Sequence, residues 1–426
     1  MLLNIHSFMF SRPLKYLLFV GFFTSLAQIS GCDQAAKTEN NDQNETNPVL
    51  LISIDGFMNE YIDRNETPNF DRFIEQGVQA EYLIPVFPTK TFPTHWSIAT
   101  GLYVENHGII SNSFYDYELE ERFSYGPPAD SPNDERWWGG EPIWITAENQ
   151  GKTAATFFWP GSEASINGVQ STRWIDYDGS VPNVERIDSV MAWLDPSGDV
   201  RADFATLYFS FVDSRGHSYG PNSPEVDEAV QEMDELLGYI LDETDQIGLS
   251  ENLNMVLVSD HGMAELSDDK VIFLNEIINL EDVDMVDWSP VAMIKPDEDK
   301  TIEIYEALKA NEEHYRVYLR EDLPERFHFS DHYRIPEIIM IADVGYTITT
   351  RPFFEERGVI AGNHGFDNMA PEMHTFFAAK GPVFKQGEVV PPFESVHIYE
   401  LLTNILNLEP APNDGNADEL LHLLSN

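Results

Sequence analysis

Continuous apolar runs alternate with amphipathic stretches along most of the chain. The apolar runs predict buried strands, and they cover residues 49–54, 153–158, 204–211, 253–259, 337–342 and 374–379. Helices are predicted where Ser, Thr or Pro opens a periodic stretch, which is the case in residues 67–77, 93–100, 141–150, 224–246 and 395–406. This alternation is typical of an α/β fold with a mostly parallel central sheet flanked by helices.

The same pattern divides the chain into regions. Residues 49–426 carry the regular pattern and are predicted to form one large domain. Within it, residues 265–350 are less regular, so we expect a smaller inserted cap or lobe there. Because open α/β sheets bind ligands beyond the carboxyl ends of their strands, the residues directly after the apolar runs are the first candidates for chemistry.

The first 48 residues differ from this domain. Arg12 and Lys15 precede an apolar stretch that is too short for a spanning helix, so residues 1–31 are predicted to be a signal peptide. The stretch ends in Ile-Ser-Gly-Cys, which resembles a bacterial lipobox with Cys32 as the lipidated residue; an ordinary secretory signal with a chance cysteine is the alternative. The polar residues 32–48 would form a flexible tether. We therefore expect an exported bacterial lipoprotein, anchored through Cys32 on the periplasmic side of a membrane or at the cell surface.

Charge and cysteine content narrow the classes of function. The formal net charge is −48, which argues against the binding of duplex nucleic acid through a basic surface. If the protein acts on anionic phosphates, bound divalent cations would reverse this field locally. Cys32 is the only cysteine in the sequence, so the chain can form no internal disulfide and the domain has no cysteine nucleophile.

Aspartate and histidine residues follow several of the apolar runs. They are Asp55 after the first run, Asp213 and His217 after the run at 204–211, Asp260 and His261 after the run at 253–259, and His364 in Gly-Asn-His-Gly. Taken singly, an aspartate in this place is typical of a turn, and a lone histidine is more often structural than a ligand. Brought together, three aspartates and three histidines would suit two zinc ions. Thr91, in a turn before a helix, is a candidate nucleophile that could equally cap that helix.

Longer segments around these residues resemble one enzyme family. The nucleophile region of the nucleotide pyrophosphatase/phosphodiesterase family, within the alkaline phosphatase superfamily, is similar to residues 90–112, KTFPTHWSIATGLYVENHGIISN. Further similar segments are GEPIWITAENQG, FFWPGSEASING, YDGSVPNVERI, DSRGHSYGPNSPEV, LVSDHGM and GNHGFDN. The resemblance extends over roughly residues 48–410 and implies an alkaline-phosphatase-like fold, with residues 49–426 as the catalytic domain.

The resemblance implies two Zn²⁺ ions per subunit and a role for each matching residue. One zinc would be held by Asp213, His217 and His364. The second would be held by Asp55, Asp260, His261 and the hydroxyl of Thr91. Thr91 would attack phosphorus and become covalently phosphorylated, while Asn112, with the Thr91 backbone N–H, would bind a non-bridging oxygen. Without the resemblance, Asn112 would be interpreted as an ordinary turn residue.

The resemblance also implies a nucleotide substrate, with NTP cleaved to NMP and pyrophosphate. Family members hold the base between aromatic side chains, and the matching positions are Phe92, Trp159, Tyr177 and Tyr208. Stacking is worth about 1–3 kcal/mol per base, but large aromatics also fill cores. That alternative is serious for Tyr208 in a strand, whereas Trp159 is expected in an exposed loop. Two departures concern substrate preference: Thr94 replaces an asparagine, and Arg215 could bind a phosphate oxygen.

Two other functions remain open. The same bimetal site could serve a phosphomonoesterase or a choline-type phosphodiesterase, although the four aromatics count against both. A non-catalytic surface lipoprotein would be expected to lack part of the ligand set, whereas the whole set and Thr91 are present. We therefore predict a two-zinc nucleotide pyrophosphatase/phosphodiesterase.

Overall fold

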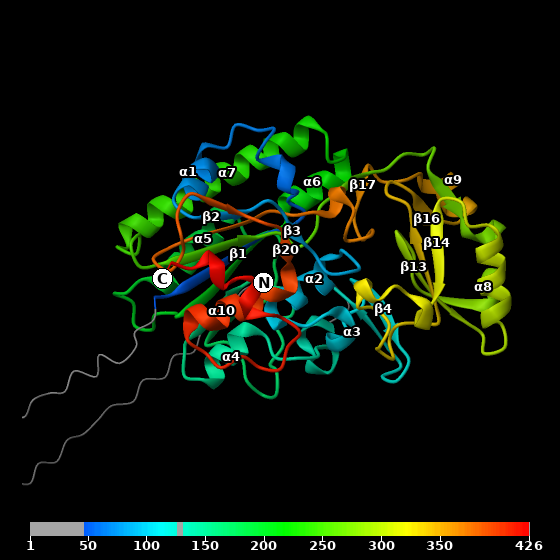
Figure 1. The fold of residues 1–426 in the computed structure, drawn as a ribbon, viewed down its shortest axis with the longest axis horizontal. Helices are drawn as coiled ribbons and strands as arrows, with labels where there is room; N and C mark the ends of the chain where they lie inside the picture. Colours follow the sequence, from blue (N-terminus) through cyan, green and yellow to red (C-terminus); the bar gives the residue numbers. More distant parts are fainter. Residues whose placement is uncertain (1–46, 126–130, 426) are drawn as a thin grey trace, which may run out of the picture. The chain divides into compact units, whose positions relative to one another are not determined.

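The computed structural model describes residues 47–125 and 131–425 (Figure 1). The predicted signal peptide, Cys32 and most of the predicted tether lie outside these described residues. The first described strand, β1 (Val49–Ile54), lies where the first apolar run predicts it.

An eight-stranded sheet forms the centre of the fold (Figure 1). Its strand order is β19 (Glu388–Val390), β2 (Val78–Ala80), β18 (Phe377–Lys380), β9 (Asn254–Val258), β1, β8 (Phe204–Phe209), β6 (Ala154–Phe157) and β7 (Arg173–Ile175). The five strands from β9 to β7 are parallel, and β18 runs antiparallel to both of its neighbours. All residues of β1 are buried, as expected for a strand with helices on both faces.

Alternate residues of β1 point to opposite faces of this sheet. Val49 and Leu51 pack into one core, and Leu50 and Ile52 pack into another. The first face is covered by α2 (Thr91–Thr100), α4 (Ile143–Asn149) and α10 (Ile398–Leu406). The opposite face is covered by α1 (Pro68–Glu75), α5 (Asn183–Leu194) and α7 (Pro224–Gln246).

Two helices begin differently from their predictions. Helix α2 begins at Thr91 instead of residue 93, because a proline in the first turn of a helix leaves no hydrogen bond unmade. Helix α1 was expected to be capped by Thr67, but that side chain makes no capping bond. Instead, the buried carboxylate of Asp234 on α7 accepts hydrogen bonds from the backbone N–H groups of Asn69 and Phe70, each at 2.9 Å.

A smaller antiparallel sheet lies within residues 265–350, the region where an insert is expected. Its strand order is β12 (Val283–Asp287), β13 (Val291–Pro296), β15 (Ile338–Ala342) and β14 (Tyr315–Leu319). Helix α8 (Thr301–Ala310) covers it (Figure 1), and side chains such as Ile294, Leu308 and Met340 form its own core. We refer to residues 283–342 as the small lobe.

Short elements connect these parts. They are the two-stranded sheets β3 (Leu83–Ile84) with β20 (Phe393–Glu394), β4 (Ser113–Asp116) with β5 (Glu121–Ser124), β10 (Ala264–Glu265) with β17 (Gly362–Asn363) and β11 (Val271–Phe273) with β16 (Thr347–Thr349), and the helices α3 (Val104–His107), α6 (Phe211–Tyr219) and α9 (Arg351–Arg357). Among them, α6, β17 and the β4–β5 hairpin lead into the candidate site.

Candidate active site

The three aspartates and three histidines predicted as ligands gather beyond the carboxyl ends of the central strands. Asp55 follows β1 directly, and Asp260 and His261 follow β9 after one residue. They form two groups in which the potential ligand atoms lie within 4.8 Å of one another: Asp213, His217 and His364, and Asp55, Asp260 and His261. These are the two sets that the family resemblance implies.

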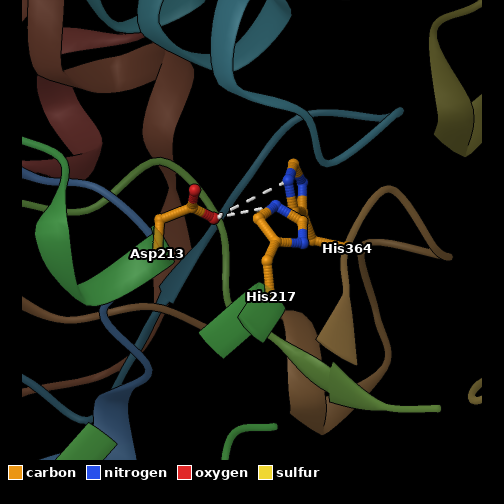
Figure 2. A group of neighbouring side chains, drawn as sticks. All are labelled: Asp213, His217 and His364. Carbon is orange, nitrogen blue, oxygen red and sulfur yellow. Dashed lines mark ion pairs between the residues drawn. The ribbon is translucent and has the colours of Figure 1, made fainter. Parts of the chain in front are cut away.

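The first group combines a helix with a distant loop (Figure 2). The apolar run at 204–211 was expected to be all strand, but β8 ends at Phe209 and α6 begins at Phe211. Asp213 and His217 therefore lie four residues apart on one face of a helix. Asp213 Oδ1 is 3.3 Å from His217 Nε2 and 3.8 Å from His364 Nε2, so both imidazoles face one carboxylate oxygen.

The second group is more deeply buried and lies beside the first. His261 Nε2 is 3.3 Å from Asp55 Oδ1 and 3.1 Å from Asp260 Oδ2, and all three side chains are almost inaccessible to solvent. The rings of His261 and His364 stack with their centroids 3.4 Å apart, which joins the two groups.

Gly56 allows the two groups to approach each other. Its φ is +69°, and a Cβ atom there would lie 2.9 Å from Cα and Cβ of Asp213. The backbone N–H of Asp213 donates to the carbonyl oxygen of Asp55 at 3.1 Å. A side chain at position 56 would therefore push α6 away from the end of β1.

Backbone carbonyls orient all three imidazoles in the same way. The Nδ1 atoms of His217, His261 and His364 lie 2.9, 3.0 and 2.9 Å from the carbonyl oxygens of Gly362, Gly262 and Thr89. Since a carbonyl can only accept, each Nδ1 carries the proton, and each Nε2 presents its lone pair to the aspartates. This arrangement is typical of histidines that bind metal through Nε2.

The aspartates present matching oxygen atoms. Asp55 Oδ1, Asp213 Oδ1 and Asp260 Oδ2 are buried and have no hydrogen-bond partner among the described residues. The same three oxygens face the Nε2 lone pairs. Carboxylate oxygens and unprotonated Nε2 atoms are both hydrogen-bond acceptors, so this arrangement is unfavourable unless a cation lies between them. The mixed imidazole and carboxylate donors fit zinc, and two groups of three provide two such sites.

The electrostatics of the groups agree with this interpretation. Burial and repulsion from neighbouring aspartates raise the pKa of Asp55 and of Asp260 well above their usual range. Burial lowers the pKa of His261 and of His364 well below its usual range, which keeps both imidazoles neutral. A bound divalent cation would stabilise the ionised carboxylates and accept the neutral imidazoles as ligands.

Thr91 and Asn112 lie against the second group. Thr91 Oγ1 is 3.2 Å from His261 Nε2, at the first residue of α2. The backbone N–H of Phe92 donates to Asn112 Oδ1 at 2.9 Å. This bond fixes the orientation of the amide, because it directs Asn112 Nδ2 toward Thr91 Oγ1 at 3.5 Å. Asn112 therefore presents a hydrogen-bond donor beside the threonine hydroxyl.

A cavity of about 720 Å³ opens over Thr91, and all four predicted aromatics line it. Tyr177 is half exposed, whereas Trp159 is buried and its indole N–H donates to the carbonyl oxygen of His95 at 3.1 Å. Trp159 therefore does not lie in an exposed loop as expected. Tyr125, which sequence reasoning missed, stacks on Phe92 with ring centroids 5.4 Å apart. It follows the last residue of β5, in a hairpin that the sequence analysis did not predict.

Tyr208 has a second feature besides its place in the cavity wall. It is 6% exposed, and its hydroxyl donates a short hydrogen bond to Asp55 Oδ2. This bond leaves Asp55 Oδ1 directed at the other ligands. The contact indicates that Tyr208 orients a candidate ligand, in addition to any contact between its ring and a base.

Replacing Tyr208 by phenylalanine separates these two roles. We expect Tyr208→Phe to weaken zinc binding at the second group about 10–100-fold, because the outer oxygen of Asp55 loses its donor. The Michaelis constant for a nucleotide should change little, since the ring is retained. Competition with a chromophoric chelator measures the zinc affinity, and initial rates at saturating zinc measure the Michaelis constant. An unchanged zinc affinity with a raised Michaelis constant would contradict the orienting role.

Glu163 is a further cavity residue that sequence reasoning missed, although it lies in one of the segments that resemble the family. Burial raises the pKa of Glu163 to about 7, and its Oε2 has no hydrogen-bond partner among the described residues. Nothing in the local sequence distinguishes it from a surface glutamate. Only the fold places it in a wall that excludes water.

The raised pKa of Glu163 predicts a pH-dependent loss of stability. The folded state holds this proton up to about pH 7, whereas an unfolded glutamate loses it near pH 4.3, so stability falls as pH rises between these values. Glu163→Gln stays neutral and should raise the melting temperature by roughly 2–4 °C at pH 8, with no gain at pH 4. Thermal denaturation at both pH values checks this, and an equal gain at both would contradict the titration.

The two departures from the family pattern lie outside the cavity wall. The Arg215 side chain is exposed, and its guanidinium lies 6.0 Å from the Tyr219 ring centroid on the outer face of α6. This contact does not support the suggested role in phosphate binding. Thr94 is fully buried in α2, and its hydroxyl has no partner among the described residues.

The sequence and the fold resemble those of known proteins. The chain is 40% identical to human ectonucleotide pyrophosphatase/phosphodiesterase family member 1, over 90% of this chain and 42% of that protein, so it spans less than half of that relative. It is 38% identical to human bis(5'-adenosyl)-triphosphatase ENPP4, over 95% of this chain and 85% of that protein. Murine ectonucleotide pyrophosphatase/phosphodiesterase 5 superposes with a TM-score of 0.85 at 34% identity, covering 89% of this chain and 100% of that chain. The predicted alkaline-phosphatase-like α/β fold is confirmed.

The predicted localisation is wrong. We expected a bacterial lipoprotein, but the relatives that match most of this chain are human and murine proteins. Cys32, on which that expectation depended, lies outside the described residues. No helix in residues 47–125 and 131–425 combines the length and apolar character needed to cross a bilayer.

The predicted enzyme class is confirmed by the comparison of sequences. Residues 49–367 match the family described as Type I phosphodiesterase / nucleotide pyrophosphatase, and this range includes every candidate ligand, Thr91 and Asn112. Relatives named as pyrophosphatases, phosphodiesterases and a triphosphatase agree with an enzyme that hydrolyses nucleotide phosphodiester bonds. The chain belongs to the type I phosphodiesterase/nucleotide pyrophosphatase family.

Proposed function

We propose that the protein cleaves nucleoside triphosphates to the monophosphate and pyrophosphate through a covalent phosphothreonine at Thr91. The observation that carries this proposal is the position of the Thr91 hydroxyl, 3.2 Å from His261 Nε2 and 3.5 Å from Asn112 Nδ2, in the wall of the large cavity. Related phosphoanhydrides such as dinucleoside polyphosphates belong to the same substrate class, and one relative is named for such an activity.

Two zinc ions would be held by the two groups of ligands. Asp213, His217 and His364 would bind one, and Asp55, Asp260, His261 and the Thr91 hydroxyl would bind the other. Zinc bound there supplies Lewis acidity, which lowers the pKa of a coordinated hydroxyl and stabilises charge on the transferring phosphoryl group. The orphaned aspartate oxygens and the Nδ1-protonated histidines support this assignment.

The chemical step needs a nucleophile and a donor to the phosphoryl oxygens. Thr91 Oγ1 attacks the α-phosphorus, the new O–P bond forms as the bond to the pyrophosphate oxygen breaks, and the hydroxyl proton is released. Asn112 Nδ2 donates to a non-bridging oxygen whose negative charge grows in the transition state. Water then attacks the phosphothreonine, which releases the nucleoside monophosphate and restores the Thr91 hydroxyl.

The aromatic wall would hold the base. Phe92 adjoins the nucleophile and is itself supported by Tyr125, so a base lying on the open side of this wall would be oriented with its α-phosphate toward Thr91. Tyr177 lies 51% exposed in the same wall, and its ring is packed against Phe158 with centroids 5.1 Å apart. A murine relative has been solved as an inactive variant in complex with AMP, which supports a nucleotide ligand here.

Removing the exposed aromatic should weaken nucleotide binding selectively. We expect Tyr177→Ala to raise the Michaelis constant for ATP by roughly 5–100-fold, because one stacking partner contributes about 1–3 kcal/mol. A small aryl phosphodiester has no base, so its Michaelis constant should change by less than about twofold. Steady-state rates on both substrates measure this, and equal effects on the two would contradict a base-binding role for Tyr177.

The proposed reaction is tested by product analysis on a panel of substrates. Initial rates would be measured on ATP, a dinucleoside polyphosphate, a nucleoside monophosphate and a choline phosphodiester, with and without a chelator. AMP and pyrophosphate from ATP, with activity restored by zinc after chelation, would support the proposal. Turnover of only the monoester or only the choline ester would instead support the phosphomonoesterase or the choline-type phosphodiesterase on the same metal groups.

A further inference from the structure

We propose that Asp287 of the small lobe is a positioning residue that sets the spacing between Thr91 and Asn112. This inference rests on the proposed function, since it concerns the nucleophile and the oxyanion donor named there. Asp287 Oδ2 accepts hydrogen bonds from Lys90 Nζ and from Ser111 Oγ. Lys90 directly precedes Thr91 and Ser111 directly precedes Asn112, so one carboxylate oxygen holds the residue before each of the two catalytic groups.

This three-residue contact is well enclosed. The Lys90 and Asp287 side chains are 8% and 18% exposed, and Ser111 is buried. Lys90 Nζ lies 3.4 Å from Ser111 Oγ, which closes the network, and the backbone N–H of Trp288 donates to Asp287 Oδ1 at 2.8 Å. Every polar atom of the aspartate is therefore engaged, and charge-assisted bonds in such surroundings are stronger than neutral ones exposed to water.

An irregularity in β12 directs Asp287 into this position. The register of β12 against β13 shifts between Met285 and Asp287, which is a β-bulge. Val283 before the bulge packs into the core of the small lobe, whereas Val286 packs into the core of the main sheet. Bulges turn side chains and are frequent beside active sites. Simple alternation would place Asp287 on the face of Val283; the extra residue of the bulge turns it to the face of Val286, where its carboxylate reaches Lys90.

The catalytic pair needs such support because its direct contacts are few. The loop that carries Asn112 meets the start of α2 through the 2.9 Å bond from the Phe92 N–H and through the 3.5 Å contact between Asn112 Nδ2 and Thr91 Oγ1. The second contact is at the upper limit of a hydrogen bond. A displacement of about 1 Å at a reacting group can lower the rate about 100-fold, so a clamp on both segments would act on the rate.

Asp287 and Ser111 are the informative positions for a test. Lys90 also packs against Gly365, where a Cβ atom would lie 3.0 Å from Lys90 Cε. Thr89, before Lys90, accepts the bond from His364 Nδ1. Substitutions of Lys90 would therefore disturb a metal ligand as well. Asp284 provides a matched control, since it is an exposed aspartate of the same strand whose carboxylate, among the described residues, bonds only the Tyr117 hydroxyl, at 3.3 Å.

The test measures kcat, the Michaelis constant, zinc content and melting temperature for six variants of the full chain. They are Asp287→Ala, Asp287→Asn, Ser111→Ala, Asn112→Ala, Thr91→Ala and the control Asp284→Asn. We expect Asp287→Ala to lower kcat for ATP about 10–100-fold, with zinc content and Michaelis constant within about twofold of the parent. Asp287→Asn and Ser111→Ala should lower kcat less, and Asp284→Asn should not lower it.

A double-mutant cycle separates positioning from simple fastening of the lobe. If Asp287 acts through Asn112, its removal should matter little once Asn112 is gone, because the effects of coupled residues are not additive. The kcat of the double variant should then be less than about threefold below that of Asn112→Ala alone. A lower melting temperature with unchanged kcat, or full additivity in the cycle, would overturn the inference. If Asn112→Ala and Thr91→Ala keep full activity, the proposed function itself fails and the inference fails with it. If kcat falls in those two variants but not in Asp287→Ala or Ser111→Ala, only the inference is rejected.

Discussion

Replacing Thr91 by alanine should lower kcat on ATP by about 10³-fold or more, because the variant has no oxygen to form the covalent intermediate. Zinc content should change little, since the six aspartate and histidine ligands remain. The AMP affinity should also persist, because the aromatic residues of the cavity wall remain. Single-turnover measurements with ATP that carries ³²P at its α-phosphate, quenched in acid, report labelled Thr91, still bearing the nucleoside monophosphate, in the parent and its absence in Thr91→Ala.

Two comparisons make this result specific. Thr91→Ser keeps a hydroxyl and should retain measurable turnover and a labelled intermediate. Thr94→Ala makes the same substitution one turn along the same helix, where the hydroxyl is buried and has no partner among the described residues, so activity should be kept. Full activity of Thr91→Ala, or label that remains in that variant, would show that another group is the nucleophile.

Removing the metal ions should lower the melting temperature by roughly 10 °C. Each ion that binds only the folded state adds about 4 kcal/mol when its concentration is a thousand times its dissociation constant, and a domain of this size shifts by a few degrees or less per kcal/mol. Without cations, the three buried carboxylates face one another and the imidazole lone pairs with no compensating charge. Differential scanning calorimetry before and after exhaustive chelation, then after zinc is restored, measures the effect.

Single substitutions test the two proposed metal sites separately. Asp213→Asn and Asp260→Asn should each reduce the bound zinc from about two ions to one per chain and lower the melting temperature by part of the full amount. Asp176→Asn is the matched control, because it alters an exposed aspartate of the same cavity that belongs to neither group. A protein that keeps two zinc ions in both ligand variants would contradict the assignment of these aspartates.

The central strands and the candidate ligands could be identified from the sequence because their signals are local. Strand β1 was predicted at its full length, since a strand buried on both faces is apolar at nearly every position. Asp55, Asp260 and His261 were found because they break such runs at the ends where parallel sheets bind ligands. The family resemblance then assigned Thr91 and Asn112, which residue type alone left undecided between catalytic and structural roles.

Other features depended on contacts between segments far apart in the chain. The sequence predicted residues 204–211 to be a single strand, and only the turn of the chain at Ser210 places Asp213 and His217 on one helix face. Trp159 was expected in an exposed loop, but it packs against the start of α2. The fold alone brings Glu163 and Tyr125 into the cavity wall, because neither stands in a local pattern that predicts a binding site.

By itself, the sequence determined the α/β class, the positions of several central strands and helices, the candidate ligands and the family, because each of these is written in residues that are neighbours along the chain or in a recognisable segment. Tertiary structure alone decided which oxygen and nitrogen atoms face one another, that Tyr208 holds Asp55, and that Asp287 reaches Lys90 and Ser111. Those relations join residues separated by up to 275 positions in the chain, and they follow from backbone packing and from a β-bulge that no local pattern of side chains specifies.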